Sequence, residues 1–415
     1  MKKIVKVVLY CCILFNTSYG FAKELLIATT LSTDATAHII KKWEETQKNI
    51  SINTLNRTSN SIERLVDSPF NNKIDLILTS SPMLMDHLRE GKHLEAIPLN
   101  IDENINRFIP ERLNNFVVPI ALSGFGILSN KTYLNNNSLN IPITWEDLTQ
   151  SSYQELVLMS SPSRSDTNHL MIEAVLQQYG WEKGWELLLK IGGNLATISS
   201  RSFSVGSKIK TGVGAIGITI DNYAFLLADD SNLVFHYLPT NVVSPTFIAV
   251  SANSQHKEEA FQFIQFLLSP EGQKIISDPE TGKYPVYQLP PTSPLFQQQI
   301  RLLQTNDIDY DLVIKRQDLV KLLFDTAITF RLNQLKENWK LLYDVENKKQ
   351  QKLTDIEKLL TQVPVTAEQA NDANYYTQFS QSVNKSRLTV IQWQAFFQTN
   401  NQKVIDELEK QNASF

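Results

Sequence analysis

The spacing of apolar residues divides the chain into two parts. From residue 24 to about residue 289, short apolar runs alternate with stretches in which apolar residues recur every three or four positions. Short runs are typical of buried strands and the longer period is typical of amphipathic helices, so this part is predicted to be α/β. We expect strands at residues 24–28, 50–55, 74–78, 156–159, 195–199 and 215–221, and helices at residues 167–179 and 256–268.

The pattern changes after Pro290 and Pro291. From residue 309 onward strand signals almost disappear, glycine is absent after Gly282, and amphipathic stretches such as residues 385–410 dominate. Long apolar faces at helical spacing indicate helices that pack against another surface. We therefore expect residues 295–415 to form an all-helical C-terminal extension. It either docks a membrane partner or adds packing that braces the first lobe.

Two extended segments, residues 116–129 and 244–250, are expected to cross from one sheet to another. Two α/β lobes joined by more than one crossing form a hinge. We assign residues 23–118 and 244–294 to the first lobe and residues 119–243 to the second.

Residues 1–22 have the three parts of a secretory signal peptide. Lysines among the first six residues form a basic start, residues 7–15 are apolar, and Gly20 and Ala22 are the small residues before a cleavage point. We therefore expect export to the periplasm with cleavage near Ala22. Loss of three lysines and no acid changes the formal net charge from −4 to −7.

Composition excludes several classes of function. The chain has 39 basic and 43 acidic residues and no dense basic block, so we expect no nucleic-acid partner. No apolar run reaches the ~18 residues of a membrane span, so the protein is not expected to be membrane-embedded. Its only cysteines, Cys11 and Cys12, lie in the signal peptide, and the six histidines are scattered. We therefore expect no metal site and no cofactor.

Hydroxyl-rich segments follow the expected strands of the first lobe. Thr30 and Ser32 follow the first strand, Arg57 follows the second, and Ser80 and Ser81 follow the third. In open α/β sheets ligands bind at this edge, so we take these residues as candidate ligand contacts. Helix capping is the competing explanation for the hydroxyls.

The second lobe offers a denser candidate. A strand ends near Met159 and a helix begins near Thr167, where free backbone N–H groups and nearby donors suit an anion. An arginine at this position can bind a phosphate or carboxylate through bidentate hydrogen bonds. The candidate contacts are Ser163, Arg164, Ser165, Asp166 and Thr167. Asp166 is assigned to capping or to a ligand hydroxyl, and the alternative for the segment is a plain capped helix with a solvated arginine.

Ser200 and Arg201 form a similar corner after the next strand, with a surface loop as the alternative. Asp221 ends the strand after that and is a candidate for a ligand hydroxyl, or for a core or capping role. His169 is expected to be half-buried packing. Because no G-x-S-x-G motif accompanies Ser165 and His169, we expect no catalytic residue and no enzyme activity.

Two sequence segments resemble segments of periplasmic solute-binding proteins of the two-lobed type. Residues 141–148 with Tyr153 resemble the opening of the second lobe in that superfamily, and residues 260–273 resemble its late helix. The resemblance covers about residues 23–290. It implies a type 2, Venus-flytrap periplasmic binding protein fold, here with the C-terminal helical extension.

A closer resemblance spans nearly the whole chain. Its core lies in residues 55–59, 77–84, 158–171, 198–203, 281–286 and 324–328. These segments are similar to the family of phosphoglycerate transport regulatory proteins. That family implies a periplasmic regulator that binds a small phosphorylated acid (3-phosphoglycerate, 2-phosphoglycerate or phosphoenolpyruvate) and acts with an inner-membrane sensor kinase through its periplasmic domain. The alternatives are the substrate-binding subunit of an ABC importer and an interaction protein with a vestigial cleft.

Overall fold

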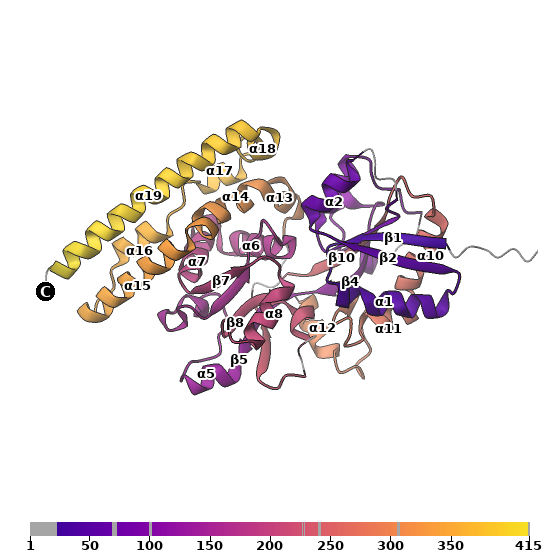
Figure 1. Cartoon of the computed structure of the whole chain (residues 1–415), viewed down its shortest axis with the longest axis horizontal. Helices are drawn as coiled ribbons and strands as arrows, with labels where there is room; N and C mark the ends of the chain where they lie inside the picture. Colours follow the sequence, from indigo (N-terminus) through magenta and orange to yellow (C-terminus); the bar gives the residue numbers. More distant parts are fainter. Residues whose placement is uncertain are drawn as a thin grey trace, which may run out of the picture.

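The computed structural model describes residues 23–68, 73–98, 102–225, 227, 229–239, 242–304 and 308–413. The expected signal peptide, residues 1–22, lies outside the described residues. The chain forms two α/β lobes side by side, with a layer of helices on the second (Figure 1). No described helix is long and apolar enough to cross a membrane.

The first lobe is built on a six-stranded sheet in the order β11-β4-β10-β3-β1-β2. Strand β1 runs parallel to β2 and β3, whereas β10 is antiparallel to β3 and β4, and β11 is antiparallel to β4. The strands are β1 (Lys23–Thr29), β2 (Ile50–Asn56), β3 (Leu76–Thr79), β4 (Val118–Ser123), β10 (Ser244–Val250) and β11 (Tyr284–Pro285). The helices are α1 (Thr33–Thr46), α2 (Ser59–Val66), α3 (Pro82–Glu90), α4 (Glu103–Asn106), η1 (Glu111–Leu113), α10 (Lys257–Leu268) and α11 (Pro270–Ile276).

The second lobe is built on a five-stranded sheet in the order β7-β6-β8-β5-β9. Strand β6 is parallel to β7 and β8, and β5 is antiparallel to β8 and β9. The strands are β5 (Phe125–Asn130), β6 (Val157–Ser160), β7 (Leu195–Ser199), β8 (Ile216–Ile220) and β9 (Leu233–Tyr237). The helices are α5 (Lys131–Asn136), η2 (Asp147–Thr149), η3 (Ser151–Tyr153), α6 (Asp166–Tyr179), α7 (Trp181–Gly193), α8 (Phe203–Lys210) and α9 (Asp221–Phe225).

One crossing between the lobes falls inside its expected segment, residues 116–129, whereas residues 244–250 lie wholly in β10 of the first sheet. Strand β4 belongs to the first sheet and β5 to the second, so this crossing falls at Gly124 rather than at residue 119. The return crossing leads from β9 into β10. The α/β architecture with two linked lobes is thereby confirmed.

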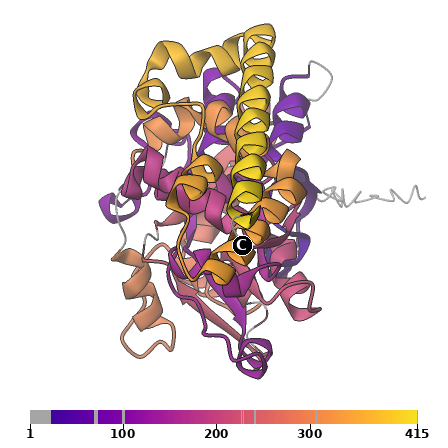
Figure 2. The same ribbon diagram turned by 90° about the vertical axis from the view of Figure 1, so that its left-hand side faces the viewer.

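The extension consists of helices, as expected. They are α12 (Phe296–Leu303), α13 (Tyr310–Lys315), α14 (Gln317–Ala327), η4 (Thr329–Arg331), α15 (Leu332–Lys349), α16 (Thr354–Thr361), α17 (Ala367–Asn371), α18 (Ala373–Gln381) and α19 (Val383–Ala413). Figure 2 shows α19 running along the outer face of this layer.

The extension packs mainly on the second lobe, which corrects the idea that it braces the first. Apolar residues of α13–α19 share one core with those of α6 and α7. At Gly193 of α7 an added Cβ would lie only 2.4 Å from the ring of Trp339, so glycine permits α15 to approach this closely. Helix α12 packs instead with Tyr284 and Leu122 of the first lobe, and α13 contacts α3 of that lobe.

A buried ion pair fixes the extension to the second lobe. Arg316, between α13 and α14, donates from Nε and Nη2 to the carboxylate of Glu173 on α6 at 2.9 and 2.6 Å. Both side chains are almost fully buried. Removing one member of such a pair leaves a buried charge without compensation, which is costly. The extension, which supplies Arg316, is therefore an integral part of this lobe.

Candidate functional site: a cationic cleft between the lobes

A cavity of about 480 Å³ lies between the lobes, at the carboxyl ends of the parallel strands of both sheets. Its lining follows β1, β2 and β3 on the first lobe and β6, β7 and β8 on the second. The lining residues are Thr30, Leu31, Thr58, Ser59, Asn60, Arg64, Ser80, Ser81, Ser163, Arg164, Ser165, Asp166, Thr167, Ser200, Arg201, Ser202, Phe203, Ile220, Asn222, Tyr223 and Lys283.

The first-lobe wall consists largely of hydroxyl groups that are already hydrogen-bonded within that lobe. Oγ1 of Thr30 lies 2.7 Å from Oγ1 of Thr79, and Oγ of Ser80 lies 3.0 Å from Oγ1 of Thr246. Ser81 caps α3 by accepting the Leu84 N–H at 3.0 Å. These residues therefore line the cleft and hold strand-to-helix corners at the same time.

Helix α2 completes this wall and was not among the expected contacts. Thr58, Ser59 and Asn60 line the cleft where β2 gives way to α2, and Arg64 follows one turn later. The Thr58 side chain makes no capping bond to α2, so the first backbone N–H groups of this helix lack a side-chain partner there. The signal was available in the sequence, because Thr58-Ser59 is a hydroxyl pair directly after a strand.

The second-lobe wall carries Arg164 in the loop between β6 and α6. Ser165 is the N-cap of α6 and accepts the Asn168 N–H at 3.4 Å. Arg164 is exposed, and its guanidinium has no partner among the residues that the structure describes. An unpaired guanidinium beside a helix N-terminus is a favourable setting for an anion.

Arg201 reaches across the cleft. It precedes α8, and its Nη2 donates to the carbonyl oxygen of Thr30 on the other lobe at 2.9 Å. The guanidinium also lies 5.1 Å from the centre of the Phe203 ring. This side chain therefore contacts both walls in the present arrangement.

Asp166 is the second bridge between the lobes. The Ser59 hydroxyl on the first lobe donates to its Oδ2, and Lys321 Nζ on α14 lies 3.3 Å from its Oδ1. Burial alone would raise the pKa of Asp166, but the charge of Lys321 and the hydroxyls of Ser59 and Ser81 outweigh it, so the pKa is lowered. Asp166 is therefore ionised and its charge is compensated by the extension.

A buried lysine lies at the floor of the cleft. Lys283 donates from Nζ to the hydroxyl of Ser123 at 3.2 Å, and burial lowers the pKa of Lys283 to about 8 although Asp221 opposes the shift. The side-chain amide of Asn222 is buried there with no hydrogen-bond partner among the described residues. Buried polar groups are normally satisfied, so an unpaired amide in a cavity wall is suited to a ligand.

The charges of the cleft favour an anion. Arg64, Arg164, Arg201 and Lys283 line it, and Asp166, the one acid among the described lining residues, is already paired with Lys321. Guanidinium groups, hydroxyls and helix N-termini are the donors that phosphate and carboxylate groups require.

Three predicted contacts lie outside the cleft lining. Ser32 is half-buried at the start of α1, and Arg57 is exposed and donates to the carbonyl of Asn56. Asp221 is fully buried. Its Oδ2 accepts the Gly124 N–H at 2.7 Å and the Tyr237 hydroxyl at 2.9 Å. Burial raises the pKa of Asp221 to about 7. It therefore fastens the hinge crossing rather than facing a ligand.

The other predicted contacts do line the cavity: Thr30, Ser80, Ser81, Ser163, Arg164, Ser165, Asp166, Thr167, Ser200 and Arg201.

His169 is fully buried rather than half-buried. Its Nε2 lies 3.2 Å from the carbonyl oxygen of Val313, and burial lowers the pKa of His169 to about 4. It therefore serves the packing between α6 and the extension.

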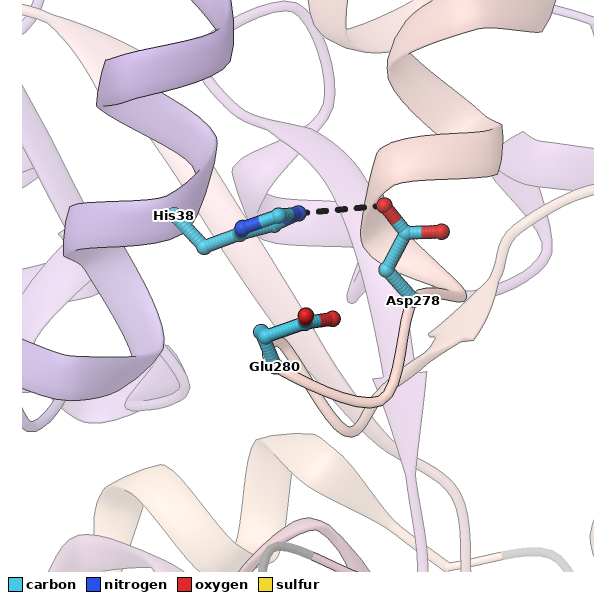
Figure 3. Close-up of side chains that lie close together, drawn as sticks. All are labelled: His38, Asp278 and Glu280. Carbon is cyan, nitrogen blue, oxygen red and sulfur yellow. Dashed lines mark hydrogen bonds and ion pairs between the residues drawn. The ribbon is translucent and has the colours of Figure 1, made fainter.

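A group of potential metal ligands lies on α1 and after α11, outside the cleft lining. His38, Asp278 and Glu280 place ligand atoms within 4.8 Å of one another (Figure 3). The His38 ring is 3.0 Å from Asp278, and Lys42 of the same helix pairs with Glu45. Exposed acidic groups of this kind are common without a metal ion, and we assign no metal to the group.

Solved structures with the same fold define the class. AfuA from Actinobacillus pleuropneumoniae, a periplasmic binding protein with fructose-6-phosphate bound, aligns with a TM-score of 0.64 at 16% identity, covering 74% of this chain and 99% of that chain. A ferric binding protein from Campylobacter jejuni aligns with a TM-score of 0.57 at 18% identity, covering 71% and 96%. At such identities the likeness concerns the fold, which is that of two-lobed periplasmic binding proteins.

Sequence comparison is more specific. Residues 71–306 match the family of bacterial extracellular solute-binding proteins. The phosphoglycerate transport regulatory protein PgtC of Salmonella typhimurium is 47% identical over 399 residues, which is 96% of this chain and 100% of that protein, and the PgtC of Salmonella typhi matches equally. The chain belongs to the bacterial extracellular solute-binding proteins and, within them, to the family of PgtC.

Proposed function

We propose that this protein is a periplasmic sensor of phosphoglycerate-type acids, which signals through a membrane sensor kinase to induce a phosphoglycerate transporter. The observation that carries the proposal is the cleft itself, where Arg164, Arg201 and Lys283 face hydroxyls and helix N-termini. The relatives named phosphoglycerate transport regulatory proteins support the choice of ligand and role.

The proposed mechanism is closure of a hinge around the ligand. Arg201 and Asp166 each contact the opposite lobe, so both bonds break when the lobes separate. A ligand with a phosphate and a carboxylate adds contacts on both walls and favours the closed arrangement by its differential affinity. The kinase then responds to the closed form.

The ligand part of the proposal is tested by calorimetry on the mature chain, residues 23–415. The titrants are 3-phosphoglycerate, 2-phosphoglycerate, phosphoenolpyruvate and, as a matched control, glycerate, which lacks the phosphate. We expect one ligand to bind per chain and glycerate to bind far more weakly. Equal binding of glycerate, or no binding of any phosphorylated acid, contradicts the proposal.

The signalling part needs a cellular measurement. In cells that lack the gene, a transporter-promoter reporter should lose its response to external phosphoglycerate while uptake through a constitutively expressed transporter continues. If uptake is lost instead, the protein is the substrate-binding subunit of an importer, which is the competing role.

A further inference from the structure

A groove lies on the helical extension, separate from the cleft. Its volume is about 710 Å³, and it runs between the α14–η4–α15 corner and the middle of α19. It is lined by Thr326, Thr329, Phe330, Arg331, Leu332, Asn333, Gln334, Gln394, Phe397 and Gln398. No residue of the cleft lining is among them.

An exposed apolar stripe leads into this groove. Phe330 is 69% exposed at its edge, and Leu388 and Ile391 on α19 are 63% and 53% exposed. Because Ile391, Gln394 and Gln398 are three and four residues apart, they share one face of the helix. Large apolar side chains gathered at a groove on the surface are typical of an interaction site.

Arg331 is the one charged residue among the described residues that line the groove, and none of these residues is an acid. Charge at an interface is normally matched by the partner, so the occupant that fits this groove is acidic.

The side chain of Arg331 lacks a hydrogen-bond acceptor for its Nε among the described residues. Its guanidinium lies 4.7 Å from the centre of the Phe397 ring, and the Nε atom is buried. Burial lowers the pKa of Arg331 to about 10. The neighbouring hydroxyl of Thr329 is also buried and unpaired. A carboxylate that enters the groove would pair with the positive charge of Arg331.

Helix α14 links the groove to the cleft. Lys321 and Asp325 of this helix bond to Asp166 and Ser161 at the cleft wall, and Thr326 of the same helix lines the groove. A partner in the groove therefore touches the helix that supports the second-lobe wall.

We infer that this groove is a docking site for an acidic amphipathic segment of a partner protein, whose apolar face covers Phe330 and Ile391 and whose carboxylate pairs with Arg331. The inference does not depend on what the cleft binds, and its test contains no small ligand.

The probe is a fluorescent amphipathic peptide of about 20 residues, long enough to form a helix, with leucines on one face and glutamates on the other. A second peptide has lysine in place of each glutamate. Fluorescence anisotropy with the mature chain should show binding of the acidic peptide, weakened by salt, and none of the lysine peptide.

Variants locate the binding. Ile391→Glu and Arg331→Gln should each weaken the acidic peptide roughly tenfold or more. Ile143→Glu is the matched control, because Ile143 is 50% exposed and does not line the groove, and it should leave the affinity unchanged. Circular dichroism checks that all variants are folded.

Several results would overturn the inference. The inference of an acidic partner would be contradicted by equal binding of both peptides, by absence of binding, or by native affinity in both groove variants. A dimer in sedimentation that Ile391→Glu separates would make a second copy of the chain the occupant instead.

Discussion

The two walls of the cleft differ in what holds them in place. On the first lobe, the hydroxyls of Thr30 and Ser80 bond within that lobe, and Ser81 caps α3 while its hydroxyl also reaches Asp166 of the second lobe. On the second lobe, the loop of residues 161–166 is bonded to Lys321 and Asp325 of α14. The extension therefore supports part of the cleft wall, although Lys321 lies 155 positions from Asp166 in the sequence.

The walls carry similar positive charge. Arg164 and Arg201 belong to the second lobe, and Arg64 and Lys283 belong to the first. We conclude that both walls offer cations to an anion and that they differ in support, because the loop that carries Arg164 is bonded to the extension. The following predictions challenge this difference, from the largest expected effect to the smallest.

Arg316→Ala should have the largest effect. It leaves the buried carboxylate of Glu173 without its partner, so the free energy of unfolding should fall by about 3–5 kcal/mol. Urea unfolding followed by circular dichroism measures it. Lys315→Ala is the control, because Lys315 forms only an exposed pair with Asp311. A loss as small as that of the control would mean that the extension is a separable layer.

Arg201→Ala and Arg164→Ala should each weaken binding of 3-phosphoglycerate. Loss of a charge-assisted hydrogen bond costs on the order of 1.5–3 kcal/mol, or roughly tenfold to a hundredfold in affinity. Calorimetry measures the change, with Lys210→Ala on α8 as a control outside the cleft lining. Native affinity in both arginine variants would show that another part of the molecule holds the anion.

The affinity should depend on pH through Lys283. Because burial lowers the pKa of Lys283 to about 8, its positive charge is lost as the pH rises through that value. Phosphoglycerate is already fully ionised there, so its affinity should fall above pH 8, roughly fivefold for about 1 kcal/mol. Calorimetry at pH 7 and pH 9 gives the ratio, and Lys283→Gln should remove most of the dependence, the remainder coming from Asp221, whose pKa is about 7. A flat profile in the native protein would place Lys283 outside the site.

Ser81→Ala should have the smallest effect on binding. The change removes the N-cap of α3, so stability should fall by about 0.5–2 kcal/mol, but 3-phosphoglycerate affinity should stay close to native. Thermal unfolding and calorimetry on the same sample separate the two quantities. A loss of affinity as large as that of Arg201→Ala would mean that the Ser81 hydroxyl itself binds the ligand.

The sequence predicted those cleft residues that directly follow a strand, because the end of a strand can be recognised from the sequence. Ser80 follows the buried strand β3 and Arg201 follows the half-buried strand β7, and parallel strands bring their carboxyl ends to one edge, so both residues line the cavity. Residues 244–250 were predicted as an extended crossing, and the structure places them instead in the first sheet as strand β10.

Other residues depend on tertiary contacts that the sequence does not display. Lys283 precedes the two-residue strand β11 and reaches the cleft floor only because that strand pairs with β4. Asp221 was expected either to face a ligand or to have a core or capping role, and its bonds to the Gly124 N–H and the Tyr237 hydroxyl agree with the core role. The support of Asp166 by Lys321 joins residues 155 positions apart and has no local signature.

The most direct test of this account is the position of the phosphate in a crystal structure of the mature protein with 3-phosphoglycerate. The account predicts phosphate or carboxylate oxygens within hydrogen-bond distance of Arg164 or Arg201, with both lobes touching the ligand. A ligand held by the first-lobe hydroxyls alone, or bound outside the cleft, would contradict it.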